Sequence, residues 1–421
     1  MTTERERIAA LDADLVKASK GIKVLSHLGW PKNCANEFIE SHQRGEARLP
    51  EIRYAKVSFA DERRALKKVM ERCDRSHPVE DFIHKTARSY DRVAELIENL
   101  GTPRFRDLSV AIYGSPKDAV AVDHTTTLHA AQRLMESTRD FAQRCAHDEA
   151  DYCVTPEAVA AALRKECEFF TGHDIQVVVD PSLSAKAAAG ALRIRIRGGT
   201  CFTDDDTAQL LHHELFVHSL TALNGREQPV LQSLGLGAPR TTRTQEGLAL
   251  FAELITNSID INRLRRIAAR CVGIDLALDG ANFIEVFRYF LATGQTDSES
   301  FSSAQRVFRG GDVRGGVPFT KDAVYLQGFV RIHNFLRDAI GSGKLDFPHF
   351  LVAGRLRASD VPRLEPFFRS GLIASPRYEP PWLTRRSSLT AFLLHSSFTN
   401  ELHLGSRSAS LGEEPEEAAK V

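Results

Sequence analysis

The sequence predicts an α+β fold that is mainly helical, with one small sheet in the middle of the chain. Long stretches of the 421 residues place apolar side chains three and four positions apart, which is the period of an amphipathic helix. Two short runs rich in β-branched residues, 175–179 and 191–197, break this pattern and predict strands. Hydrophobic residues make up 43% of the chain and charged residues 26%, which is typical of a globular protein.

The helical part begins at the N-terminus, where residues 1–105 are expected to form a helical region. A larger domain should follow over residues 106–405, and the apolar-poor, acidic residues 406–421 should form a disordered tail. Helices are predicted, in order along the chain, over Arg5–Leu15, Ala60–Cys73, Val79–Leu100, Thr125–Arg144 and Thr155–Phe170.

The two strands differ in pattern. Ile175–Val179 (IQVVV) is apolar and β-branched at four of its five positions, as expected for a buried strand. Ala191–Arg197 alternates, with arginines that include Arg195 on one face and apolar residues on the other. This alternation favours a half-exposed strand at the edge of the sheet.

Charge and composition exclude several classes of partner. Lys+Arg and Asp+Glu both number 55, so the net charge is zero and neither nucleic acid nor an anionic membrane is expected as a partner. The charged N-terminus has no signal-peptide core and no apolar run approaches membrane-spanning length, which predicts a cytoplasmic protein. The seven cysteines contain no CxxC pair, so we expect neither a disulfide framework nor a zinc ribbon, and buried, inert thiols instead.

A helix after the second strand carries the first chemical motif. Thr203 and Asp206 form a predicted capping box that opens it. It contains His213-Glu214-Leu215-Phe216-Val217-His218, an HExxxH motif that is one residue longer than HExxH. At about 100° per residue, side chains five apart on a regular helix diverge by about 140°. A π-bulge would return both histidines to one face, so we predict such a bulge between them.

The residue types fit a catalytic zinc site, which takes three protein ligands and leaves one position open. His213 and His218 supply two ligands, and Glu246, on a helix that begins near Thr244, supplies the third. Glu253, two turns after Glu246, could orient a ligand histidine from behind. Glu214 is free to act as general base. One zinc ion per chain is therefore expected, although His₂Glu sites accept other divalent metals.

The segment Thr244-Gln245-Glu246-Gly247-Leu248-Ala249, downstream of HExxxH, resembles the family named for flavohaemoglobin expression and its QEGLA motif. That family is similar to the microtubule-associated tyrosine carboxypeptidases of animals, which are zinc enzymes. The resemblance spans roughly residues 20–370. It implies a gluzincin-like metallopeptidase domain, with the small sheet beside the HExxxH helix. It also implies His213, His218 and Glu246 as ligands and Glu214 as base.

The resemblance also directs attention to groups that would hold a substrate. Gluzincin-type enzymes align an extended substrate along an edge strand, for which Ala191–Arg197 is the candidate. Tyr325 is a candidate donor to the oxyanion of the tetrahedral intermediate, with His333 as its rival. Cations near the metal would grip a terminal carboxylate, and the candidates are Arg195, Arg240, Arg243, Arg309, Arg314 and Lys321.

These features favour a cytoplasmic zinc metalloprotease of the carboxypeptidase type. It would release one C-terminal residue, aromatic or tyrosine-like, from a peptide or protein tail, by attack of zinc-bound water. An aminopeptidase or dipeptidyl peptidase is the alternative, in which Glu253 or Asp312 would bind the substrate's amine. A regulatory protein with a structural zinc is a third possibility, although no fourth ligand is apparent beyond His212 or a cysteine.

Overall fold

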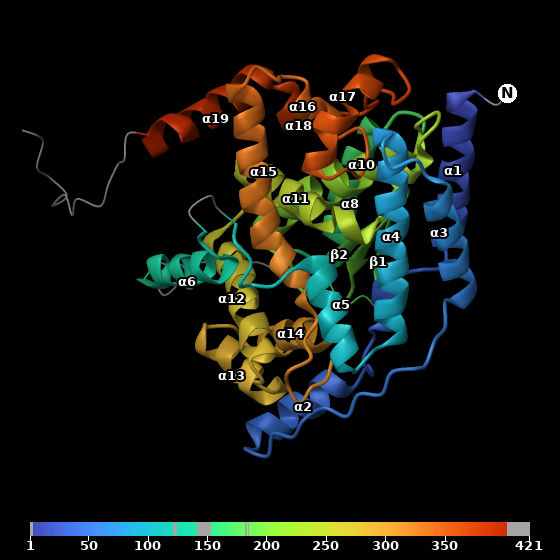
Figure 1. Ribbon diagram of the computed structural model, residues 1–421. Helices are drawn as coiled ribbons and strands as arrows, with labels where there is room; N and C mark the ends of the chain where they lie inside the picture. Colours follow the sequence, from blue (N-terminus) through green and yellow to red (C-terminus); the bar gives the residue numbers. More distant parts are fainter. Residues whose placement is uncertain (1–2, 121–123, 141–152, 182, 184, 402–421) are drawn as a thin grey trace, which may run out of the picture.

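A computed structural model of the chain describes residues 3–120, 124–140, 153–181, 183 and 185–401, and it confirms a mainly helical α+β architecture (Figure 1). The N-terminal elements are α1 (Glu4–Ser19), η1 (Val24–His27), α2 (Cys34–Gln43), α3 (Ala60–Arg72), α4 (Pro78–Glu98) and α5 (Pro103–Tyr113). The three helices predicted in this region are thus confirmed as α1, α3 and α4. The predicted tail, residues 406–421, lies outside the described residues.

The N-terminal helices do not form a core of their own. Leu11 and Leu15 of α1 are almost completely buried and belong to the same apolar cluster as Leu215 and Phe216, which flank the histidine motif. Helices α1, α3 and α4 pack on one another along the right-hand side of Figure 1. The region up to residue 105 therefore supports the rest of the fold through shared apolar contacts.

The sheet has three strands, β1 (Gln176–Asp180), β2 (Ala187–Ala189) and β3 (Arg193–Arg197), in the order β1-β3-β2. It follows α6 (Thr127–Ser137), α8 (Pro156–Glu166) and η2 (Cys167–Phe169). Strand β3 runs parallel to β1 and antiparallel to β2.

Two expectations about the strands are wrong. The alternating strand β3 lies in the middle of the sheet. Strand β1, which was expected to be buried, lies at an edge, and only Val177 of its five residues is buried. The alternation of β3 reports the two faces of the sheet, because Ile194 and Ile196 are fully buried while the arginines lie on the other face. An alternation with period two shows that one face of the sheet is exposed to solvent. Every strand of such a sheet has this pattern, so it does not identify the edge strand.

A continuous helical rod follows the sheet and carries the histidines. It consists of α9 (Asp204–Leu210), the π-helical segment η3 (Leu211–Ser219) and α10 (Leu220–Arg226), and we call it the histidine helix. The predicted capping box of Thr203 and Asp206 opens α9. The short turns η4 (Gln232–Gly235) and η5 (Pro239–Thr241) then lead to α11 (Thr242–Ile255).

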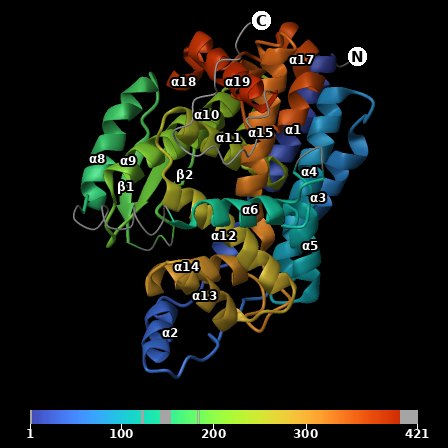
Figure 2. The same cartoon turned by 90° about the vertical axis from the view of Figure 1, so that its left-hand side faces the viewer.

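The C-terminal half adds a second, phenylalanine-rich core. Phe283, Phe287 and Phe301 pack around Phe38 of α2, so that α2, α13 and α14 gather at the lower end of the molecule in both views (Figure 2). The elements are α12 (Ile261–Leu278), α13 (Phe283–Ala292), α14 (Asp297–Phe308), η6 (Thr320–Asp322), α15 (Ala323–Gly341), α16 (Phe347–Leu351), η7 (Ala358–Asp360), α17 (Val361–Arg369), α18 (Pro381–Thr384) and α19 (Arg386–Glu401).

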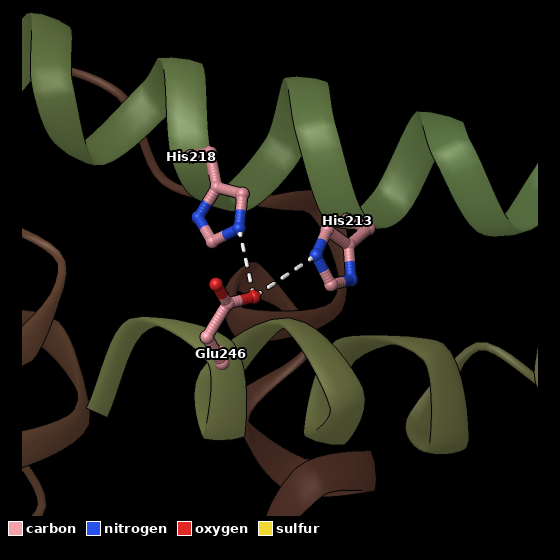
Figure 3. Close-up of side chains that lie close together, drawn as sticks. All are labelled: His213, His218 and Glu246. Atoms are coloured by element: carbon pink, nitrogen blue, oxygen red, sulfur yellow. Dashed lines mark ion pairs between the residues drawn. The ribbon is translucent and has the colours of Figure 1, made fainter. Parts of the chain in front are cut away.

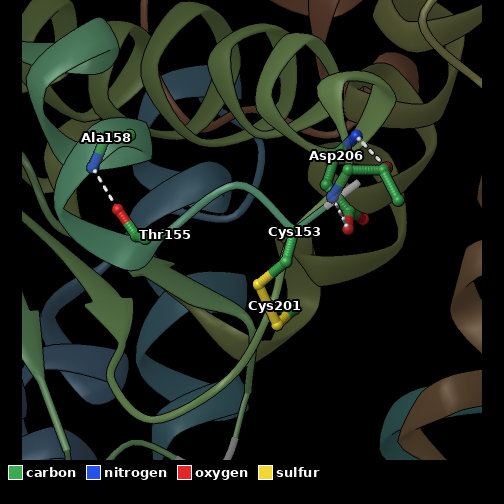
Figure 4. Close-up of a disulfide and its surroundings, with 6 residues drawn as sticks. Cys153, Thr155, Ala158, Cys201 and Asp206 are labelled. Atoms are coloured by element: carbon green, nitrogen blue, oxygen red, sulfur yellow. Dashed lines mark hydrogen bonds between the residues drawn. A yellow bond between two sulfur atoms is a disulfide. The ribbon is translucent and has the colours of Figure 1, made fainter. Parts of the chain in front are cut away.

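A disulfide joins Cys153 and Cys201, which corrects the expectation that the cysteines are all inert thiols (Figure 4). The neighbouring residues Val154 and Phe202 exchange two backbone hydrogen bonds, of 2.8 and 3.0 Å, and this bridge brings the sulfurs together. The pair spans 48 residues, so no local spacing could have indicated it. The disulfide ties the chain before α8 to the turn that opens the histidine helix.

The remaining described cysteines fit the expectation better. Cys34, Cys167 and Cys271 are buried free thiols and Cys73 is half-buried, whereas Cys145 lies outside the described residues.

No helix in the described part of the chain is both long and apolar enough to cross a membrane.

Candidate metal centre

The π-helical segment η3 brings His213 and His218 to one side of the histidine helix. Both side chains point from that helix toward Glu246 on α11 (Figure 3). Their ring centroids lie 4.7 Å apart, which a regular helix would not allow for residues five positions apart. The predicted π-bulge is therefore confirmed, and it extends over nine residues.

Glu246 completes a group of three potential metal ligands. Its Oε2 atom lies 3.5 Å from Nε2 of His213 and 3.5 Å from Nε2 of His218. The three donor atoms lie within 4.8 Å of one another, and the side chains are buried or half-buried. Two imidazoles and one carboxylate are a donor set that suits catalytic zinc.

A close helix crossing positions Glu246. The next residue, Gly247, packs directly on Gly328 of α15, and a Cβ added to Gly247 would lie 2.2 Å from the backbone carbonyl carbon of Gly328. Only two glycines allow the backbones of α11 and α15 to approach this closely. Gly247 of the QEGLA motif thus determines how closely α11 packs on α15, and with it the position of Glu246 relative to the two histidines.

Glu253 holds His213 from behind, as its spacing predicted. Its Oε1 atom lies 2.6 Å from Nδ1 of His213, and Arg263 and Gln209 donate hydrogen bonds to the same carboxylate. His213 donates its Nδ1 proton to Glu253, so Nε2 is the nitrogen that faces Glu246 and would bind a metal once it has lost its proton. Burial lowers the pKa of His213, but the hydrogen bonds to Glu246 and Glu253 outweigh it and raise the pKa to about 10. The pocket thus accommodates positive charge at His213.

Lys321 contacts the same carboxylate that the histidines face. Its Nζ atom lies 2.9 Å from Oε1 of Glu246, which leaves Oε2 for the histidines. Burial raises the pKa of Glu246, but Lys321 and the two histidines together hold it well below the usual range. Lys321, expected as a substrate-binding residue, is thus placed against a metal-ligand candidate.

Glu214 directly follows His213 on the chain and is not part of the ligand group. It is buried, and its carboxylate acts electrostatically on His213 and on Arg355. Arg355, which sequence reasoning missed, lies in the turn after α16 and donates a hydrogen bond of 3.1 Å to the carbonyl of His218. No periodic or motif signal marks Arg355, because it enters the site from an irregular segment far along the chain.

Tyr325 lies one helical turn beyond Lys321, whose ammonium stands 5.2 Å from the centroid of the tyrosine ring. Its hydroxyl accepts a hydrogen bond of 3.5 Å from Arg306, which in turn pairs with Asp322. Arg309 also lies 3.8 Å from Asp322. The structure thus groups two of the expected residues, Tyr325 and Arg309, with an arginine and an aspartate that sequence reasoning missed.

Other expected residues lie apart from this group. Arg314 is exposed and pairs with Asp312 inside the compact glycine-rich loop. Arg195 forms an ion pair with Asp180 on the open face of the sheet. His333, the rival of Tyr325, hydrogen-bonds to Ser396 of α19.

Arg240 and Arg243, which precede Glu246 on the chain, are both engaged elsewhere. Arg240 makes a buried, two-point ion pair with Asp360. Arg243 donates to the carbonyl of Tyr113 at the end of α5. His212 packs beside Phe216 and its buried Nδ1 has no hydrogen-bond partner among the described residues.

Comparison with known families agrees with this centre. A family model described as microtubule-associated tyrosine carboxypeptidase matches residues 36–401, which include both helices that carry the ligand candidates. No individual curated protein matches the chain. Because the family model covers most of the sequence, the chain belongs to the microtubule-associated tyrosine carboxypeptidase family, and this membership implies carboxypeptidase-like peptidase activity.

Proposed function

We propose that the protein is a gluzincin-like zinc carboxypeptidase that removes one C-terminal residue from a peptide or protein tail. The convergence of His213, His218 and Glu246 carries this proposal, together with the tautomer that Glu253 imposes on His213. The donor atoms match the number and type that zinc uses in hydrolytic sites, and no fourth described side chain joins the group. Such a site is expected to be catalytic and not structural.

The residues around the ligands supply the remaining chemistry. A bound zinc would act as a Lewis acid, polarising the substrate carbonyl and acidifying a water. Glu214 would take the proton of that water and pass it to the leaving amine. Its place next to His213 and outside the ligand group supports this role. Tyr325 would donate a hydrogen bond to the developing oxyanion, since Arg306 can hold its hydroxyl in place.

Strand β2, and not the expected Ala191–Arg197, is the edge that packs against η3. Lys186 and Gly190 hydrogen-bond to β3, so the alternating backbone groups of Ala187 and Ala189 point away from the sheet. Ser219, at the end of η3, anchors this edge through a 2.8 Å bond to the carbonyl of Gly190. An extended substrate would pair with Ala187 and Ala189.

The charges around the centre favour a carboxypeptidase over an aminopeptidase. An aminopeptidase needs an unengaged acidic group for the substrate's amine. The two acids considered for that role are occupied, Glu253 by His213 and Arg263 and Asp312 by Arg314. Cations, in contrast, are abundant around Tyr325.

Metal analysis and peptide cleavage test the proposal together. Purified protein should contain about one zinc per chain and shorten a peptide library by single C-terminal residues, which mass spectrometry detects. Glu214→Gln should keep the zinc and lose at least about 100-fold in rate, as expected for loss of a general base. Glu227→Gln, at the exposed end of the same helix, should leave the rate unchanged. Loss of N-terminal residues would point to an aminopeptidase, and failure to bind zinc would refute the proposal.

A further inference from the structure

Five cationic side chains lie in the neighbourhood of Tyr325. Arg306 donates a hydrogen bond of 3.5 Å to its hydroxyl, and the ammonium of Lys321 lies 5.2 Å from its ring centroid. They come from different elements: α12, α14, the turn directly after α14, and η6. They are Arg263, Arg270, Arg306, Arg309 and Lys321. This concentration of positive charge adjoins the metal centre, because Lys321 contacts Glu246 directly.

Three of the five cations are each matched by one carboxylate. Arg263 donates to Glu253 at 2.7 Å, Lys321 to Glu246 at 2.9 Å. Arg306 donates to Asp322 at 2.9 Å. Each charge in these three pairs therefore has a hydrogen-bonded partner of opposite sign.

Arg270 and Arg309 remain without a matching carboxylate. Each approaches Asp322 only to 3.8 Å, and Asp322 is already hydrogen-bonded to Arg306. Neither guanidinium donates a hydrogen bond within the described residues, and the buried Nε atom of each has no partner there. Their side chains are 20% and 14% exposed, so a ligand can reach them.

Without a matching carboxylate, both guanidinium groups have lowered pKa values. Burial, followed by repulsion from Arg306, lowers the pKa of Arg270 to about 9 and that of Arg309 to about 10. Holding two such guanidinium ions beside a third is costly unless an anion joins them. A ligand that brings one negative charge and two acceptor oxygens would satisfy both.

We propose that Arg270 and Arg309 form the binding site for the terminal carboxylate of the peptide substrate. The inference deepens the proposed carboxypeptidase function and rests on it. A guanidinium offers a planar pair of donors that matches the two oxygens of a carboxylate. Asp322 would keep the two guanidinium groups in position, since Arg270, Arg306 and Arg309 all approach its carboxylate. Lys321, which contacts Glu246 and lies beside the ring of Tyr325, links this site to the metal centre.

The test measures binding in the zinc-loaded Glu214→Gln protein, so that cleavage does not interfere. The probes are fluorescein-labelled hexapeptides that end in each of the twenty residues, prepared as free acids and as C-terminal amides. Fluorescence anisotropy should show at least one acid binding about 10-fold or more tighter than its amide. Arg270→Gln and Arg309→Gln, each in this background, should weaken acid binding about 10-fold and leave amide binding unchanged. The matched control is Arg288→Gln, an exposed arginine on α13.

Each other outcome contradicts the assignment. Equal binding of acids and amides, or no binding of either, would refute it. So would an acid preference that survives the Arg270→Gln/Arg309→Gln double variant with an unchanged unfolding midpoint. Inorganic phosphate that binds through the two arginines without any acid preference among the peptides would identify a simple anion site. Because no cleavage is needed, a clear acid preference alongside an inactive wild-type protein would refute only the proposed function.

Discussion

At the scale of single residues, the centre depends on side chains that never touch a metal. Glu253 is completely buried and receives hydrogen bonds from His213, Arg263 and Gln209 at once. A buried carboxylate that accepts hydrogen bonds from three donors has little freedom to move, so it also restrains the orientation of the His213 imidazole. The orientation of the first ligand therefore depends on Glu253 of α11 and on its partners, which lie outside the histidine motif.

Replacing Glu253 by alanine should test this dependence. The change removes the acceptor that orients His213, and it leaves the half-buried guanidinium of Arg263 without its carboxylate partner. Zinc affinity, measured by competition with a chromophoric chelator, should fall about 10- to 100-fold. Asp312→Ala, which removes an acid bound only to the exposed Arg314, serves as control and should leave the affinity unchanged. Equal affinities for the two variants would show that Glu253 does not orient the ligand.

At the scale of elements, the sequence predicted what local periodicity and capping determine. The helices α1, α3 and α4, the capping box at Thr203 and the π-helical insertion all follow from spacing along a few turns. The order of the strands could not be predicted in this way, because it depends on which distant segments pair in the sheet. Strand β2 itself was not predicted, because its three alanines include no β-branched residue.

The same limit applies to the site. The ligand set follows from short-range motifs, whereas Arg270 and Arg355 enter from segments whose contacts are set by tertiary packing. An arginine on a helix normally indicates a solvated face, so its sequence neighbourhood carries no sign of burial. The disulfide of Cys153 and Cys201 was missed for a related reason, since a backbone bridge between distant segments creates it.

Gly247→Ala tests the crossing of α11 and α15 as an element-scale feature. The added methyl group would collide with the backbone of Gly328, so the helices must separate and carry Glu246 away from the histidines. The free energy of unfolding in urea should fall by about 1–3 kcal/mol, and the zinc content should fall with it. Gly341→Ala, at the end of α15 with open space around it, should change neither. A stable Gly247→Ala protein with full zinc content would contradict this account of the motif's glycine.

At the scale of the whole molecule, the N-terminal helix α1 is joined to the centre's scaffold by a buried carboxylate. Asp12 of α1 accepts hydrogen bonds from the backbone amide of Ser233, in the turn η4 that follows the histidine helix. Burial raises the pKa of Asp12 from 3.8 to about 6, and the hydrogen bonds from Ser233 offset only part of that effect. The contact between the N-terminal region and the rest of the fold is therefore sensitive to pH.

The sign of this effect follows from proton binding. Between about pH 4 and pH 6 the folded protein keeps a proton on Asp12 that the unfolded chain has released, so this contribution to stability is complete below pH 4 and is lost as the pH rises through 6. Asp12→Asn cannot ionise and avoids the cost of a buried carboxylate. Metal-free Asp12→Asn should thus exceed the metal-free wild type by about 1–3 kcal/mol in unfolding free energy at pH 8, and the gap should close toward pH 4. Because all other titrating groups are common to both proteins, a gap that stays constant from pH 4 to pH 8 would show that folding does not raise the pKa of Asp12.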